Sequence, residues 1–198
     1  KLQSLQSSLP PGVKVVPFYN RSSLIERAVA TVQDALLEAT VLVVILLLLF
    51  LGELRAALVV ALMLPFAALY TFLLMRWTGQ SANLMSLGGL AIAVGMLVDG
   101  AVVVVENVVA RLSDERHAGS GKLHAVLVAS AEVAKPVASG MAIIALVFLP
   151  LLTLEGLEGK LFSPVALTIV LSLLSALLLS LTLVPVLAYF GLKVKDGH

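Results

Sequence analysis

Long apolar runs are the feature that most limits what this chain can fold into. Several of them exceed the roughly 18 residues at which an apolar run indicates a helix that crosses a membrane. Only 13% of the 198 residues are charged and 60% are hydrophobic, whereas about a quarter of the residues in a soluble domain are charged. We therefore expect an all-α integral membrane protein, a polytopic bundle of about five transmembrane helices. The net charge of +1 gives no electrostatic basis for binding nucleic acid.

The start of the chain is its only stretch of soluble character. Residues 1–22 contain a Pro-Pro-Gly turn and then a run at 13–19 whose composition is typical of a short strand. Ser23, followed three residues later by Glu26, resembles a capping box and predicts that a helix opens there. This helix is expected over residues 24–52, with amphipathic first turns outside the bilayer and an apolar remainder inside it.

The other expected spans follow at short intervals, over residues 56–77, 83–109, 136–154 and 164–190. Pro136 is expected at the first position of the fourth span, where proline is well tolerated. The polar connection before it, residues 110–135, is expected to be partly helical along the membrane surface. The segment LEGLEGK, residues 154–160, is expected to be an exposed turn rather than a site that attracts cations.

Lysine and arginine are unevenly shared between the two sides of these spans. One side has Arg55, Arg111, Arg116, Lys122, Lys135, Lys193 and Lys195, whereas the other has only Arg76 and Lys160. Cytoplasmic connections carry the excess of positive charge, so the C-terminus is expected in the cytoplasm and the N-terminal segment outside it. The expected organisation is the end of an extracytoplasmic domain and the helix entering the membrane (1–35), a helix bundle (36–190) and a cytoplasmic tail (191–198).

Two carboxylates interrupt the apolar run GMLVDGAVVVVEN, residues 95–107. Asp99 and Glu106 are seven residues apart, which places them about 20° apart on one helical face and roughly 10 Å apart along the axis. A charge inside a bilayer costs about 2.5–3.5 kcal/mol on insertion scales. No lysine or arginine of the predicted spans lies at the depth of Asp99. Asp99 is therefore expected either to be protonated much of the time or to have a cationic partner on a helix outside this sequence. Both cases fit a group that loads and releases a proton.

Structural roles remain open for both acids and for their neighbours. Asp99 could hydrogen-bond a neighbouring helix as structural glue, and Glu106 could be solvated at the membrane boundary. Asn107 lies close to the same polar face and is expected to contribute to helix packing near Asp99. Gly95 and Gly100 are small enough to let other helices approach the Asp99 helix closely.

The segment NLMSLGGLAIAVGMLVDGAVVVVENVVARL, residues 83–112, resembles the fourth transmembrane helix of resistance-nodulation-division (RND) exporters, with the heavy-metal efflux branch as the best match. The resemblance extends through FLGELRAALVVALMLPFAAL before it and PLLTLEGLEGKLFSPVALTIV after it. It implies that the chain holds the second to sixth helices of a larger transporter of the bacterial inner membrane. It also implies that Asp99 is the proton-relay carboxylate and Glu106 the second acid of the motif.

The family implies partners beyond these helices. They are the membrane lipid, the remaining helices and periplasmic domains of the parent transporter, a homotrimeric assembly, a periplasmic adaptor and an outer-membrane channel. Protons and metal cations would be the substrates. No resident cofactor and no catalytic residue are implied, and the protein is expected not to be an enzyme.

The residues around Asp99 bear on the substrate class. Multidrug members of the family carry two adjacent aspartates where this chain has Asp99 and Gly100, which favours metals over organic compounds. Ala93 stands where zinc–cobalt–cadmium members often have a further aspartate, and Met85 stands where copper–silver members place a methionine. A thioether suits Cu(I), but methionine also fills gaps in apolar packing, so Met85 is a weak candidate ligand and the metal stays open.

Three other functions are weighed against metal export. The chain could be a truncated or isolated membrane module without transport activity of its own, or part of an RND exporter of organic compounds. An intramembrane aspartyl protease needs two facing aspartates, and the predicted spans contain one, Asp99.

Overall fold

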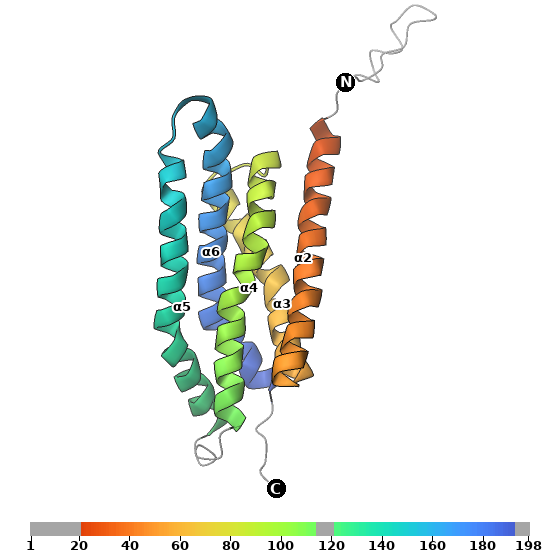
Figure 1. Ribbon diagram of the computed structural model, residues 1–198, viewed down its shortest axis with the longest axis vertical. Helices are drawn as coiled ribbons and strands as arrows, with labels where there is room; N and C mark the ends of the chain where they lie inside the picture. Colours follow the sequence, from red (N-terminus) through yellow and green to blue (C-terminus); the bar gives the residue numbers. More distant parts are fainter. Residues whose placement is uncertain (1–20, 114–120, 193–198) are drawn as a thin grey trace, which may run out of the picture.

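The computed structural model describes residues 21–113 and 121–192 as a bundle of five helices (Figure 1). They are α2 (Arg21–Leu51), α3 (Leu54–Trp77), α4 (Leu84–Ser113), α5 (Lys122–Leu152) and α6 (Gly156–Gly191). All five are long and apolar enough to cross a membrane. The expected all-α fold with five spans is confirmed, whereas the strand expected at residues 13–19 lies outside the described residues.

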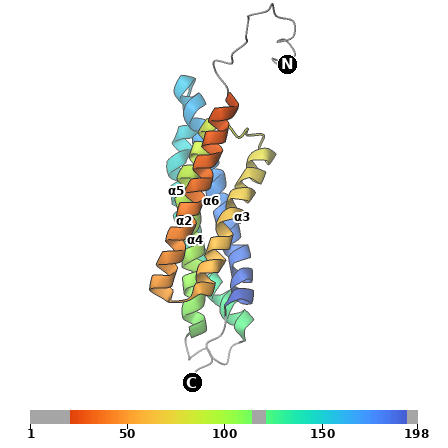
Figure 2. The same cartoon turned by 90° about the vertical axis from the view of Figure 1, so that its right-hand side faces the viewer.

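Helix α4 lies at the centre of the bundle and contacts each of the other four helices. In Figure 1, α2 and α5 flank it on either side, while α3 and α6 lie behind it. Figure 2, turned by 90°, shows α3 crossing the bundle obliquely, so that the end of α3 leans away from α2. The front of α4 therefore has no helix over it among the described residues.

Short turns join most of the helices. Helix α2 ends at Leu51, and Gly52 adopts a φ of 65°, the left-handed conformation in which glycine commonly ends a helix. The Gly52 N–H then donates to the Leu48 carbonyl oxygen at 3.1 Å. Asn83 caps the start of α4, because its side-chain oxygen accepts from the Ser86 N–H at 2.9 Å. The predicted end of the first helix at residue 52 and the predicted start of the third span at residue 83 are each within one residue of the observed boundary.

Four helices begin earlier than expected, α3 by only two residues, at Leu54. Helix α2 is already formed at Arg21, so Ser23 lies inside it rather than at its start. Helix α5 begins at Lys122 and runs without interruption through Pro136. Helix α6 begins at Gly156, so the expected exposed turn is helical from that residue, although Glu155, Glu158 and Lys160 are exposed as predicted.

The part of the connection at residues 122–135 is helical, as expected, and it forms the start of α5 instead of a separate segment. Ala125, Val126 and Ala129 are buried against the bundle, so this part of α5 packs on the other helices. Proline inside a membrane helix is tolerated where packing and local hydrogen bonds compensate for the lost N–H. The same reasoning applies to Pro164, which lies inside α6 rather than at its first turn.

Candidate functional site

An exposed stripe runs the length of α4. Its members recur every three or four residues, which keeps them on one side of the helix. They are Gly88, Ile92, Gly95, Asp99, Val103 and Glu106. The opposite side of α4 is buried against the bundle, with Leu90, Ala93, Leu97, Ala101, Val104 and Val108 fully enclosed. Both carboxylates therefore lie on the face of α4 that the other described helices leave open.

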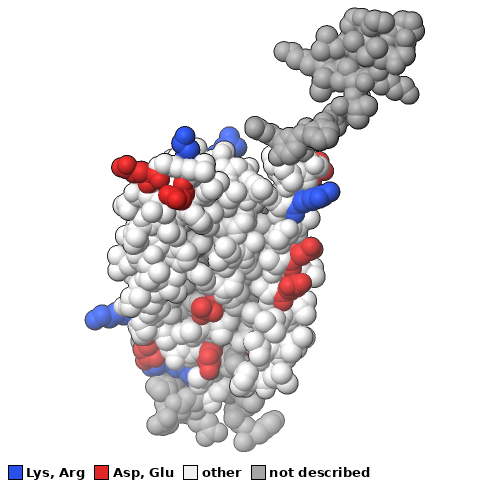
Figure 3. Space-filling model, turned by 45° about the horizontal axis from the view of Figure 1, so that its top comes forward, with Lys and Arg blue, Asp and Glu red and all other residues white. Residues whose placement is uncertain are grey.

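Asp99 lies near the middle of α4, far from both ends of the bundle. Among residues 21–113 and 121–192, neither Asp99 nor Glu106 has a hydrogen bond or an ion pair to another side chain or to the backbone. Figure 3 shows acidic groups standing singly on a broad uncharged face, while the other charges gather mostly towards the ends and along α2. A carboxylate so far from water requires compensation by a proton or by a cation.

Glu106 borders an apolar hollow between α2 and α4. The cavity has a volume of about 350 Å³, and its other lining residues are Val43, Leu46, Leu47, Phe50 and Val102. The hollow is partly open to the surroundings, so this flank of the Glu106 side chain is not covered by the described helices.

The other flank of α4 is held by a polar network. Asn107 Nδ2 donates to the Ala129 carbonyl oxygen at 2.7 Å and to Glu132 Oε2 at 3.3 Å. Arg111, one turn further along α4, forms an ion pair with Glu132 Oε1. Both carboxylate oxygens of Glu132 thus bind side chains of α4.

Sequence reasoning missed Arg111 and Glu132 as parts of the site. Asn107 was expected only to help helices pack, and Glu132 fell in the stretch assigned to the membrane surface. One signal was available, because Asn107 and Arg111 are four residues apart and share a helical face. Their partner could not be identified without knowing that α5 begins before Pro136.

The two glycines expected to help packing behave differently. A Cβ atom on Gly100 would lie 2.5 Å from Met141 Cε and 3.2 Å from Ser180 Oγ, so Gly100 lets α5 and α6 approach α4. A Cβ atom on Gly95 would meet no described atom within 4 Å. Gly95 lies on the open face near Asp99, and none of the described helices lies against it.

Met85 lies in the first turn of α4 and is 37% exposed. It is more than three helical turns from Asp99 along α4. Within the described part of the chain, no group of three or more His, Cys, Asp or Glu residues could hold a metal ion. The described residues therefore contain no metal site of that kind, and Met85 remains an untested candidate.

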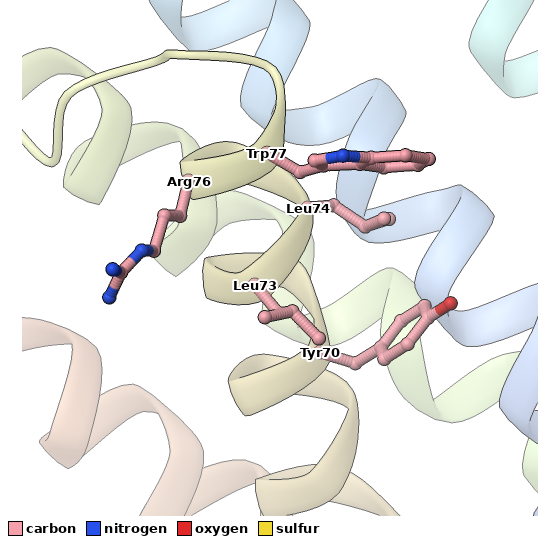
Figure 4. Close-up of a pocket in the computed structure, with 5 residues that line it drawn as sticks. All are labelled: Tyr70, Leu73, Leu74, Arg76 and Trp77. Carbon is pink, nitrogen blue, oxygen red and sulfur yellow. The ribbon is translucent and has the colours of Figure 1, made fainter.

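A second hollow lies at the far end of α3, away from both carboxylates. Its volume is about 430 Å³, and it is lined by Tyr70, Leu73, Leu74, Arg76 and Trp77. Figure 4 shows the side chains of Tyr70, Leu74 and Trp77 pointing to one side of α3 and that of Arg76 pointing to the other. Tyrosine, tryptophan and arginine at the end of a span are typical of a membrane boundary. This hollow has no acid among its lining residues and does not join the α4 site.

Comparison with known proteins gives one consistent family. Residues 1–196 match the model of the AcrB/AcrD/AcrF family. The cobalt-zinc-cadmium resistance protein CzcA of Cupriavidus metallidurans is 46% identical over 204 residues, which cover 99% of this chain and 19% of CzcA. The cation efflux system protein CusA of Escherichia coli K12 is 40% identical over 202 residues, which cover 98% of this chain and 19% of CusA.

A solved structure agrees with the sequence matches. The crystal structure of a heavy metal efflux pump superposes with a TM-score of 0.73 at 40% identity, covering 93% of this chain and 18% of that pump. The chain thus spans about a fifth of the length of the relatives it matches. These matches confirm the resemblance to heavy-metal RND exporters that residues 83–112 carry.

Proposed function

The chain belongs to the AcrB/AcrD/AcrF family, and on that premise we propose that it forms part of a proton-coupled transporter that exports heavy-metal cations. Asp99 carries the proton, and Glu106 serves as the second acid of the same path. The observation that carries the proposal is the position of Asp99, an unpaired carboxylate at mid-helix on the open face of α4.

The open face supports a relay role over a purely structural one. A structural aspartate would hydrogen-bond a neighbouring helix, but Asp99 has no such bond among the described residues. Burial in hydrocarbon disfavours its charged form unless a cation approaches. A cation on a helix outside the described residues, packed against the open face, pairs with Asp99 when it is ionised and is released when it is protonated.

Protonation of Asp99 then acts as a switch. The neutral carboxyl no longer holds the partner cation, so α4 shifts against its neighbours. Helix α2 lies beside α4 and leads out of the bundle towards the N-terminal segment (Figure 1). Movement of α4 against α2 changes the contact between these two helices, and α2 transmits this change towards the extracytoplasmic side. Glu106, about 10 Å further along α4, lies towards the opposite side.

The substrate class follows from the relatives and from the residue after Asp99. CzcA is a cobalt-zinc-cadmium resistance protein and CusA a cation efflux protein. Gly100 occupies the place of the second aspartate of multidrug members. A metal cation is therefore the proposed cargo, with an organic compound as the alternative substrate.

The assembly proposed is that of the family. The transporter sits in the bacterial inner membrane with the N-terminal segment of this chain in the periplasm and its C-terminus in the cytoplasm. It forms a homotrimer joined to a periplasmic adaptor and an outer-membrane channel. The described helices belong to its first half, and the proposed protein is a carrier rather than an enzyme.

Proton flux in vesicles tests this function. The complete exporter is reconstituted, and zinc, cobalt, nickel, cadmium, copper and silver are added in turn. Flux with at least one metal is expected, and the metal that produces it identifies the cargo. Asp99→Asn is expected to abolish the flux. Asp34→Asn is the matched control, because Asp34 is an exposed aspartate on α2, and it is expected to leave flux unchanged.

Two results would count against the proposal. Proton flux that persists in Asp99→Asn would indicate that Asp99 has a structural role and does not carry the proton. Flux driven by organic cations and by none of the six metals would favour the organic-compound exporter. The 198 residues reconstituted alone are expected to be inert, because Asp99 then lacks its cationic partner, and this is the behaviour of a membrane module without transport activity.

A further inference from the structure

The two flanks of α4 are built differently at the end that carries Glu106. On the α5 side, Asn107 and Arg111 both bind the carboxylate of Glu132. On the α2 side, Val43 and Leu47 are buried in the core, and beside this contact lies the apolar, partly open hollow of about 350 Å³ that Glu106 and Val102 border. One flank is fixed by directional polar contacts and the other has room to move.

The polar flank fixes α4 in two ways. Asn107 and Arg111 are one helical turn apart, so a single carboxylate that binds both resists rotation of α4 about its axis. The bond from Asn107 to the Ala129 carbonyl oxygen resists sliding of α4 along α5. The Arg111 side chain is 20% exposed and that of Glu132 50%, so the ion pair lies at the edge of the bundle. Its contacts are charge-assisted, and such contacts are stronger than neutral hydrogen bonds.

The apolar flank offers no comparable restraint. Val43, Leu46, Leu47 and Phe50 of α2 present only hydrocarbon to the cavity. Dispersion contacts are non-directional, and an unfilled gap forfeits part of them. A small displacement of α4 relative to α2 therefore breaks no hydrogen bond on this side.

We propose that Arg111, Asn107 and Glu132 are positioning residues that make α4 and α5 move as one body against α2. The proposal rests on the function proposed for Asp99, because that residue supplies the event that moves α4. We call these three residues the clamp. Because of the clamp, protonation of Asp99 displaces α4 and α5 together, and the end of α4 does not merely twist. It also fixes the direction in which Glu106 points, because Asn107 is the next residue.

Charge exchange in the complete exporter tests the clamp. With zinc as the probe metal, Glu132→Gln and Arg111→Gln are each expected to lower proton flux per folded molecule roughly fivefold to tenfold. The exchanged pair, Arg111→Glu with Glu132→Arg, is expected to recover flux to within about twofold. Asn107 remains compatible with the exchange, because its amide can accept as well as donate. Lys135→Gln, an exposed position on α5, is the control and is expected to have no effect.

A distance measurement tests the clamp without transport. Spin labels at Ser113 on α4 and Ala131 on α5 report the clamped flank, and labels at Ser113 and Leu49 report the α2 flank. All three positions are exposed. Asp99→Asn, which imitates the protonated state, is expected to change the Ser113–Leu49 distance and to leave the Ser113–Ala131 distance unchanged. In Arg111→Gln the distribution of Ser113–Ala131 distances is expected to broaden.

Several outcomes would overturn the clamp. The first is that the single variants transport at the rate of the unmodified exporter. The second is that the exchanged pair transports no faster than the single variants. The third is that the Ser113–Ala131 distance changes in Asp99→Asn. A lower amount of protein in the membrane with unchanged flux per molecule would show that the ion pair serves folding alone. Asn107→Ala, which removes one donor, provides a milder variant if the charge variants fail to fold. If zinc drives no flux in the unmodified exporter, that result bears only on the proposed function. The clamp is then tested by the two spin-label distances alone.

Discussion

Gly89 of α4 lies so close to Val165 of α6 that a Cβ atom at position 89 would be 2.8 Å from the Val165 carbonyl oxygen. The atom in the way belongs to the backbone, so no side-chain rotation can relieve the clash. The same Cβ would lie 3.3 Å from Thr168 Cβ. The packing of α4 on α6 therefore depends on a glycine at this position.

Gly89→Ala is expected to destabilise the bundle by about 1–3 kcal/mol, the usual cost of inserting a methyl group into a packed interface. Gly88→Ala is the matched control, because a Cβ there would meet no described atom within 4 Å. Thermal unfolding of the purified chain in detergent measures both. Equal unfolding temperatures for the two variants would show that α4 and α6 do not approach as described.

Gln80 ties the α3–α4 turn to α6. Its Nε2 donates to the Pro164 carbonyl oxygen and to Thr168 Oγ1, each at 2.9 Å. Gln80→Leu is expected to cost about 1–3 kcal/mol, since each hydrogen bond contributes about 0.5–1.5 kcal/mol. Gln33→Leu, at an exposed position of α2, is expected to be neutral in the same unfolding assay. Comparable losses at both positions would assign the effect to added apolar surface.

Lys122 joins the start of α5 to the end of α6. Its ammonium group donates to the Leu192 carbonyl oxygen and lies 5.2 Å from the centre of the Tyr189 ring. Lys122→Met is expected to cost about 1–3 kcal/mol, because a carbonyl left unpaired at a helix end loses a charged donor. Lys160→Met, exposed at the start of α6, is the control. A stability loss confined to Lys122→Met supports the contact, and no loss would show that water replaces it.

The spacing of the residues predicted much of the α4 site. The separation of seven positions between Asp99 and Glu106 predicted that both acids lie on one helical face, and the structure has both on the exposed stripe. The absence of a lysine or arginine at the same depth predicted that Asp99 has no partner within these spans. The first inference depends only on the regular geometry of a single helix, and the second on which residue types the five spans contain.

The contacts between helices could not be predicted in the same way. Met141 fills the space beside Gly100, although 41 positions separate them, and nothing in the local sequence indicates that pairing. Glu132 was missed because Pro136 was taken as a helix boundary. Packing of Ala125 and Ala129 against the bundle outweighs the cost of that proline, and such a tertiary contribution is not visible in local propensity.

The orientation of the chain can be tested with single cysteines, because none of the 198 residues is a cysteine. Ser113 at the end of α4 and Glu158 at the start of α6 are both exposed and lie at opposite ends of the bundle. The cation-rich connections lie on the Ser113 side, which predicts that this side is cytoplasmic.

A membrane-impermeant maleimide applied to intact cells is therefore expected to label Glu158→Cys and to spare Ser113→Cys. Ser113→Cys is expected to react only after the cells are permeabilised, which shows that its thiol is accessible and merely on the other side. The reverse pattern would place the N-terminal segment in the cytoplasm. Helix α2 would then lead towards the wrong compartment, and protonation of Asp99 could not act on a periplasmic domain through it.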